Sequence, residues 1–371
     1  MRFLLLLCIW GSAFAHDAHK HGHGGKPAEG VVSLDVYRDG EAIHVLTGEA
    51  DSVWYQRSTD GGTSWTTKTR VSGASKPSGM RPGNDAQVAA QGERIVALWP
   101  VAGSGWGGSG PFAGARSADG GKTWTPSPTP ADTGSTAGHG FADLLFDRDG
   151  LHAVWLDGRD KAQGLRYARS TDFGATWSPN DTIAAGTCEC CWNTLAKGDA
   201  LHVMYRGKGP RDMSLASLMP AGWQKRGAVA AFNWEVKGCP ETGGGLVVAP
   251  DGALHTLSWT GATGKEGLYY AASRDGGAKW TAPARMGSAA AQHSDLAVSG
   301  QGLLGAVWDD DGAILEATSR DGGRTWSRAA RVSAAADAAS HPRIVATAKG
   351  FLVLWTERTR EGRRELRTTI R

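Results

Sequence analysis

The chain has 371 residues and a formal net charge of +3, from 40 basic and 37 acidic side chains that are interspersed along it. This balance argues against a nucleic-acid or membrane-surface partner, because such a partner is bound by a concentrated basic patch. The 53 glycines and 16 tryptophans are high counts, as expected for a chain with many tight turns and repeated aromatic contacts.

Residues 1–15 have the features of a secretory signal peptide. Arg2 supplies a positive charge, residues 3–10 are apolar, and Ala13-Phe14-Ala15 fits the small-x-small pattern that precedes cleavage. We therefore expect a periplasmic or secreted protein, in which four cysteines remain in an oxidising compartment. No later segment is apolar enough to predict a membrane span.

Residues 16–30 form a glycine- and histidine-rich segment that we expect to be flexible. Four histidines lie within it at His16, His19, His21 and His23. Histidines in such a segment suit Cu(II), Ni(II) or Zn(II), and cleavage after Ala15 would place a free α-amine beside the His16 imidazole. The alternative is a solvated tail with no specific ligand.

A short pattern, Ser-x-Asp-x-Gly-x-Ser/Thr-Trp, occurs five times after this segment, and only Lys279 departs from it. The pattern predicts a turn, because Asp and Ser bond nearby backbone amides, Gly supplies positive φ and Trp fills the space beneath. A longer gap between the third and fourth copies indicates that a sixth copy has been lost near Pro220-Ala-Gly-Trp223. The repeated aspartates are Asp60, Asp119, Asp172, Asp275 and Asp321.

Seven hairpins of alternating apolar residues precede or follow these turns, and the plainest is Phe141–Phe146 with Leu151–Leu156. Short strands at this spacing, with an internal repeat, predict an all-β fold: a single β-propeller of four-stranded blades over residues 31–371. We favour seven blades, with six as the alternative. The last blade is either three-stranded or completed by residues near the N-terminus.

The repeated turn is the Asp-box, so the chain resembles the Asp-box (BNR) β-propeller proteins, of which sialidases are the best known. The resemblance implies the propeller fold and implies that the Asp-box is a structural turn far from any substrate. Sialidases have six blades, so seven blades would be a departure. The Cys-x-Cys-Cys and Gly-Cys-Pro motifs are similar to those of a sialidase-like subgroup of this family.

Histidines and cysteines gather at one end of the predicted central channel, where the chain enters the innermost strand of each blade. One interpretation is two disulfides, in which Cys239 pairs with one of the adjacent Cys190 and Cys191 and Cys188 pairs with the other. The other is a soft-metal site for Cu(I), formed by thiolates and histidines. Both can hold together, as one disulfide and one metal-binding pair of cysteines. The residues concerned are Cys188, Cys190, Cys191, Cys239, His139, His293 and His341.

The family resemblance also raises a sialidase hypothesis, which requires three arginines that clamp a carboxylate, a Tyr nucleophile with its Glu, and an Asp acid/base. The family's first arginine motif, Phe/Tyr-Arg-Ile/Leu-Pro, is absent. Our main hypothesis is therefore a non-hydrolytic binding protein that handles copper. The alternatives are an exo-α-sialidase-type glycoside hydrolase and a protein-interaction scaffold. Candidates for the hydrolase are Arg81, Arg206, Arg343, Tyr205 and Glu241.

Overall fold

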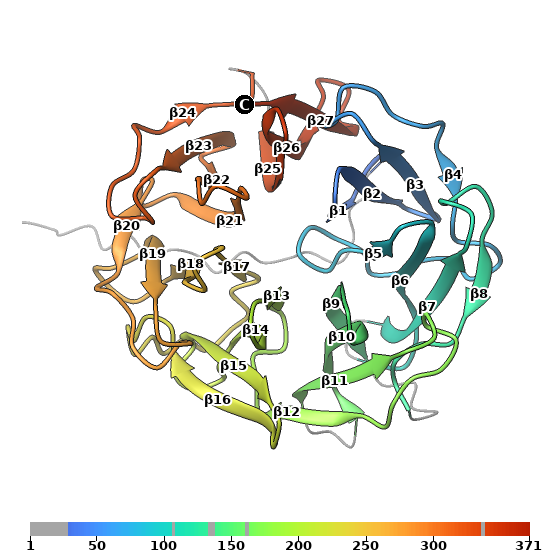
Figure 1. Ribbon diagram of the computed structural model, residues 1–371, viewed down its shortest axis with the longest axis horizontal. Helices are drawn as coiled ribbons and strands as arrows, with labels where there is room; N and C mark the ends of the chain where they lie inside the picture. The colour runs from blue at the N-terminus through green and yellow to red at the C-terminus, as the bar shows by residue number, and fades with distance from the viewer. Residues whose placement is uncertain (1–28, 106–107, 133–137, 160–162, 335–337) are drawn as a thin grey trace, which may run out of the picture.

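Seven antiparallel sheets stand radially around a central axis and form a β-propeller (Figure 1). This computed structural model describes residues 29–105, 108–132, 138–159, 163–334 and 338–371. The proposed signal peptide and the four tail histidines lie outside these residues. No helix within the described ranges is long and apolar enough to cross a membrane.

Each blade is a meander whose first strand is innermost and whose last strand is at the rim (Figure 1). The prediction of seven blades is thereby confirmed. In chain order the strands are β1 to β4 (Ser33–Asp39, Ala42–Glu49, Ser52–Ser58, Thr69–Arg70), β5 to β8 (Gln87–Gln91, Arg94–Ala102, Ser109–Ser117, Thr125–Ser127), β9 to β12 (His139–Asp147, Gly150–Asp157, Gly164–Ser170, Asp181–Ala185), β13 to β16 (Thr194–Lys197, Leu201–Arg206, Met213–Met219, Gly222–Ala228), β17 to β20 (Gly244–Val248, Leu254–Thr260, Gly267–Ser273, Ala284–Met286), β21 to β24 (Ala291–Val298, Leu304–Asp310, Ala313–Ser319, Ala330–Arg331) and β25 to β27 (Ala338–Thr347, Gly350–Arg358, Arg364–Ile370).

The second strand of each blade forms the centre of the core, because both of its faces are covered by neighbouring blades. Its residues are buried almost continuously, as along β10 and β14. Trp99, Trp155 and Trp308 on these strands are among the largest fully buried side chains. Burial of a side chain of this size contributes on the order of 3 kcal/mol, so the inter-blade layers are the main source of stability.

The Asp-box turns form as the sequence predicts. In the first, the Asp60 carboxylate accepts the backbone N–H of Thr63 at 3.0 Å and of Ser64 at 2.9 Å, and the Ser64 hydroxyl at 2.6 Å. Ser58 donates to the same carboxylate and accepts from Gly62 N, which has φ +88°. These hydrogen bonds, led by that of Ser64, hold the pKa of Asp60 below its usual range.

Buried His–Tyr pairs support several of these turns, and the sequence analysis did not find them. His44 Nδ1 lies 2.8 Å from the Tyr55 hydroxyl, and His255 Nδ1 lies 2.6 Å from that of Tyr270. Tyr55 packs under the next blade's Asp-box so closely that a Cβ on Gly121 would lie 2.1 Å from its ring. The glycine of that turn is therefore required by close approach as well as by its positive φ.

Residues near the N-terminus extend the last blade, as one of the two sequence alternatives predicted. Gly30 forms a parallel bridge with Arg364 beyond the three strands β25 to β27. Val31 N donates to the Arg364 carbonyl at 3.0 Å, and Arg364 N donates to the Glu29 carbonyl at 2.8 Å. Backbone from both ends of the described chain therefore closes the ring.

Candidate functional site

Segments that enter the innermost strands of different blades lie against one another, and we call this region the channel mouth. Arg81 pairs with Glu241, Asn84 accepts the backbone N–H of Phe141, and Trp192 contacts His293 and His341. Three of these strands are irregular there: β9, β21 and β25 each show a register shift against their partner strand. The shifts lie at Phe141, His293 and His341, and the φ of Phe141 is +54° and that of His341 is +53°. Such bulges re-aim side chains beside functional sites.

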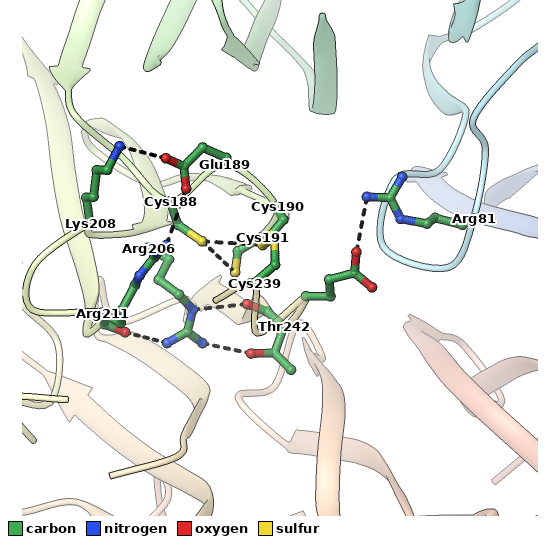
Figure 2. The surroundings of a disulfide bond; sticks show 11 residues. Arg81, Cys188, Glu189, Cys190, Cys191, Arg206, Lys208, Arg211, Cys239 and Thr242 are labelled. Carbon is green, nitrogen blue, oxygen red and sulfur yellow. Dashed lines mark hydrogen bonds and ion pairs between the residues drawn. A yellow bond between two sulfur atoms is a disulfide. The ribbon is translucent and has the colours of Figure 1, made fainter. Parts of the chain in front are cut away.

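Four cysteines lie together at the entry of the fourth and fifth blades (Figure 2). Cys190 and Cys239 form a disulfide that links these blades, which confirms that Cys239 pairs with one of the two adjacent cysteines. The expected second disulfide is not formed, because Cys188 and Cys191 are unlinked. Their sulfur atoms are 3.2 Å apart, and Cys188 Sγ is 3.7 Å from Cys190 Sγ.

The two unlinked thiols are buried and electrostatically unequal. A hydrogen bond from Cys191 and the nearby charges of Arg206 and Arg211 lower the pKa of Cys188 to about 6, although burial opposes this shift. Burial, together with the hydrogen bond to Cys188, raises the pKa of Cys191 well above its usual value. The opposite shifts favour Cys188 over Cys191 as the thiolate of this pair, and the two groups titrate as a coupled unit.

Arg206 lies beside these thiols as a structural cation between two blades (Figure 2). It is 1% exposed. Its guanidinium donates to the Thr242 carbonyl at 3.1 Å, the Thr242 hydroxyl at 3.0 Å, the Arg211 carbonyl at 2.6 Å and the Trp259 carbonyl at 3.0 Å. These contacts direct the donors of Arg206 into the protein rather than toward a ligand.

The other hydrolase candidates are also distributed among separate contacts. Arg81 pairs with Glu241 at 3.3 Å across the channel mouth, and Figure 2 shows Arg81 opposite the cysteines. Arg343 pairs with Asp85 at 3.0 Å. Tyr205 is buried on β14. The described contacts bring Arg81 and Glu241 together but do not assemble the arginines around one space.

A second group lies on the sixth and seventh blades. His293 Nδ1 is 2.7 Å from Asp309 Oδ2, and Asp309 accepts the backbone N–H groups of both His293 and His341. The two imidazoles stack with ring centroids 3.6 Å apart. Burial, followed by the proximity of His293, lowers the pKa of His341 well below its usual value, so its imidazole is neutral. Asp309 is itself buried, and it was not among the candidate residues of the sequence analysis.

His139 belongs to neither group. Its side chain is fully buried, and its Nε2 lies 3.3 Å from Asp157 Oδ2. Asp157 also binds Arg159. Burial favours the neutral carboxyl, but hydrogen bonds from His139 and Arg159 outweigh it and hold the pKa of Asp157 below its usual range. The ion pair between Asp157 and Arg159 holds the end of β10 in place.

Trp192 lies beside both groups, in the core cluster of the cysteines and against the His293–His341 pair. It follows Cys191 directly in the sequence, and its ring centroid lies 5.7 Å from that of His293 and 6.0 Å from that of His341. A Cβ on Gly243 would lie 2.3 Å from its Nε1. Apart from His139, the residues predicted as one Cys/His cluster are therefore placed in two groups, one of sulfur ligands and one of nitrogen and oxygen ligands.

Aspartates on the innermost strands form a further charged set that sequence reasoning missed. Asp35, Asp143 and Asp295 each accept a backbone N–H from the next blade's innermost strand. Burial raises the pKa of Asp35 to about 6 and that of Asp143 to about 7, with Arg343 opposing the shift in both. The available signal was an aspartate at the same position of three innermost strands.

The fold is shared with known propellers. No protein-family model and no curated protein matches the chain. A PL25 ulvan lyase structure matches with 11% identity and a TM-score of 0.60 over 93% of this chain and 94% of that one. YCF48 bound to a D1 peptide matches with 15% identity and a TM-score of 0.54, also over 93% and 94%.

The Hadza microbial sialidase Hz136 matches with 17% identity and a TM-score of 0.51, over 76% of this chain. The match spans 63% of the length of that sialidase. At these identities the likeness shows a β-propeller fold similar to that of these proteins. It does not extend to activity, because the same fold carries unrelated functions.

Proposed function

We propose that this protein is an exported, non-hydrolytic metal-binding propeller that holds Cu(I) between Cys188 and Cys191. The observation that carries the proposal is a buried, unlinked thiol pair whose sulfur atoms are 3.2 Å apart. Among the described residues, this pair belongs to one of the two groups whose ligand atoms lie close enough to hold a metal ion, and the third member of that group, Cys190, is in the disulfide.

The chemistry of the pair suits a soft monovalent ion. The thiolate is the metal-binding form of cysteine, and Cys188 has the lowered pKa that supplies it. Cu(I) prefers soft thiolate ligands. Two thiolates with one Cu(I) carry a net negative charge, which the neighbouring Arg206 and Arg211 would offset.

The N-terminal sequence predicts export to an oxidising compartment, where the two thiols have two possible states. In an oxidising compartment, two sulfur atoms this close either join as a disulfide or are held by a metal. We propose that the metal-bound form is the working state. The four tail histidines, His16, His19, His21 and His23, would bind copper independently of the thiol pair, because imidazole is a copper ligand.

The test is Cu(I) affinity, measured anaerobically by competition with a chromophoric Cu(I) chelator. The tail histidines are replaced by alanine in every protein compared. We expect one Cu(I) per chain and a loss of affinity of at least about 100-fold in Cys188→Ser and in Cys191→Ser. The matched control is the double variant Cys190→Ser/Cys239→Ser, which removes the disulfide and should retain Cu(I).

Two results would reject the copper proposal. One is equal Cu(I) affinity in the parent protein and in Cys191→Ser. The other is a Cys188–Cys191 disulfide in protein isolated under anaerobic, thiol-blocking conditions from its native compartment, as determined by peptide mass mapping. In the second case the cysteines would have a structural role.

The hydrolase alternative requires arginines that are free to clamp a carboxylate. Arg206 instead donates to four protein oxygens, and Arg81 and Arg343 are paired with carboxylates. We therefore place sialoside hydrolysis second. Turnover of a fluorogenic sialoside that is abolished by Arg81→Met would reverse this order.

The scaffold alternative draws only on fold, because YCF48 is a similar propeller whose structure contains a D1 peptide. In that case the cysteines and histidines would be structural. If the protein has the same stability with and without metal, that result would favour the scaffold alternative over metal binding.

A further inference from the structure

We propose that His293, Asp309 and His341 form a second metal site, separate from the thiol pair, that takes a borderline divalent ion such as Zn(II). One ligand atom from each residue lies within 4.8 Å of the others. Two imidazoles and a carboxylate are ligands that Zn(II) accepts, whereas Cu(I) is selected by sulfur. The inference is independent of the proposed function at Cys188 and Cys191.

The distances between the three ligand atoms differ from those in an occupied tetrahedral site. Ligand atoms around a tetrahedral ion with bonds of about 2.1 Å lie about 3.4 Å apart. The group at 4.8 Å or less therefore needs movements on the order of 1 Å to close on an ion. Because the His293 and His341 rings are stacked, they must tilt so that their ring nitrogens point to one centre.

A small cavity adjoins this group and is lined almost entirely by apolar atoms. It offers about 10 Å³ to the centre of a water molecule, which is roughly the volume that one water or one ion needs. Within the described residues, His341 Nδ1 and Ser294 Oγ are buried without a hydrogen bond. The lining residues are Gly83, Trp192, His293, Ser294, His341, Pro342 and Arg343.

The unpartnered His341 nitrogen points to an occupant. A buried polar group that lacks a partner is destabilising, and within the described residues the Nδ1 of His341 is buried without a hydrogen bond. A cation that took this nitrogen as a ligand would supply the missing partner.

The backbone is irregular at both histidines. His341 has φ +53°, which is unfavourable for a residue with a Cβ, and both histidines lie in bulges of β21 and β25. Strain of this kind persists at sites where a side chain must take a particular position. Asp309 fixes both bulges through the backbone N–H groups of His293 and His341.

The test uses full-length chain in which the four tail histidines are alanine and Cys188 and Cys191 are serine, so that neither can bind the probe. Zn(II) affinity is measured by competition with a chromophoric chelator. We expect one Zn(II) per chain and a loss of at least about 100-fold in His293→Gln and in His341→Gln. The matched control is Asp311→Asn, which removes an exposed neighbouring carboxylate and should bind normally.

Co(II) provides a spectroscopic check of the ligands. Visible d–d bands without intense sulfur-to-metal charge transfer are expected, and these bands should be lost in His341→Gln but retained in Asp311→Asn. A charge-transfer band in the thiol-containing protein that disappears in the serine background, with no d–d bands remaining, would overturn the second site. Failure here would leave the Cu(I) test at the thiol pair unaffected.

A measurement on the unaltered chain covers the case in which a histidine variant does not fold. Histidines are modified with diethylpyrocarbonate, with and without Zn(II), and the modified positions are read by peptide mass spectrometry. Zn(II) should slow modification of His293 several-fold. An equal rate in the presence and absence of Zn(II), or Zn(II) binding that persists at full strength in both folded histidine variants, contradicts the proposal.

Discussion

Replacement of Arg206 by methionine tests whether this residue is a structural cation or a ligand-binding one. Methionine keeps the apolar stem and removes the guanidinium. Three carbonyls and one hydroxyl would then lose their donor. Hydrogen bonds to charged groups contribute about 1.5–3 kcal/mol each, but removal of the buried charge also removes its desolvation cost. We expect a net loss of about 3–5 kcal/mol in the free energy of unfolding.

The assay is urea denaturation followed by tryptophan fluorescence, with the slope compared between proteins to verify two-state unfolding. Arg274→Met is the control, because Arg274 is 67% exposed and pairs only with Asp251 at 2.7 Å. Its loss should change stability by less than about 0.5 kcal/mol. An Arg206→Met protein as stable as Arg274→Met would refute the structural role and would return Arg206 to the list of ligand-binding candidates.

Three further outcomes are expected. Gly243→Ala should lower the free energy of unfolding by about 1–3 kcal/mol, because its Cβ would lie 2.3 Å from Trp192 Nε1; urea denaturation measures this, and an unchanged midpoint would contradict the packing. Asp143 has a pKa raised by burial to about 7, so its stabilising contribution is complete below about pH 4 and is lost as the pH rises through about 7. Asp143→Asn should therefore gain stability relative to the parent between about pH 5 and pH 8, by on the order of 2 kcal/mol, and a constant difference would argue against the raised pKa. Cys191→Ala should raise the pKa of Cys188 above about 6, because the hydrogen bond from Cys191 is the largest cause of the lowered value; the pH dependence of iodoacetamide alkylation, read by mass spectrometry at that residue, reports the shift.

The fold could be predicted because each blade repeats the same local chemistry. The Asp-box is stabilised by hydrogen bonds between residues of one turn, such as Asp60 and Ser64. It can therefore be predicted from a short stretch of sequence. Where the copy has been lost, β15 and β16 join by a short turn, and Trp223 still packs on Tyr167 of the preceding blade with ring centroids 5.1 Å apart. Repetition gave the blade number directly.

The candidate site was predicted only as a set of residue types, because its arrangement depends on long-range geometry. Equivalent positions in the repeat placed the cysteines and histidines at one end of the channel. The bulges at His293 and His341 could not be predicted from the sequence. The hydrogen bonds by which the Asp309 carboxylate accepts the backbone N–H groups of both histidines could not be predicted either. These features arise from contacts between blades rather than within one turn.

Trp192 explains why two kinds of ligand can lie near one another without merging. Its indole lies against His293 and His341 on one side of the channel mouth, while its neighbour Cys191 faces Cys188. Close packing against Gly243 holds the ring in place. At the two proposed sites a soft ion would favour the sulfur pair and a borderline ion the nitrogen and oxygen group, and a fixed indole would keep the imidazoles in place. Loosening the indole with a smaller residue, as in Trp192→Leu, would let the two ligand sets approach, and the selectivity of each site for its own metal should then decline.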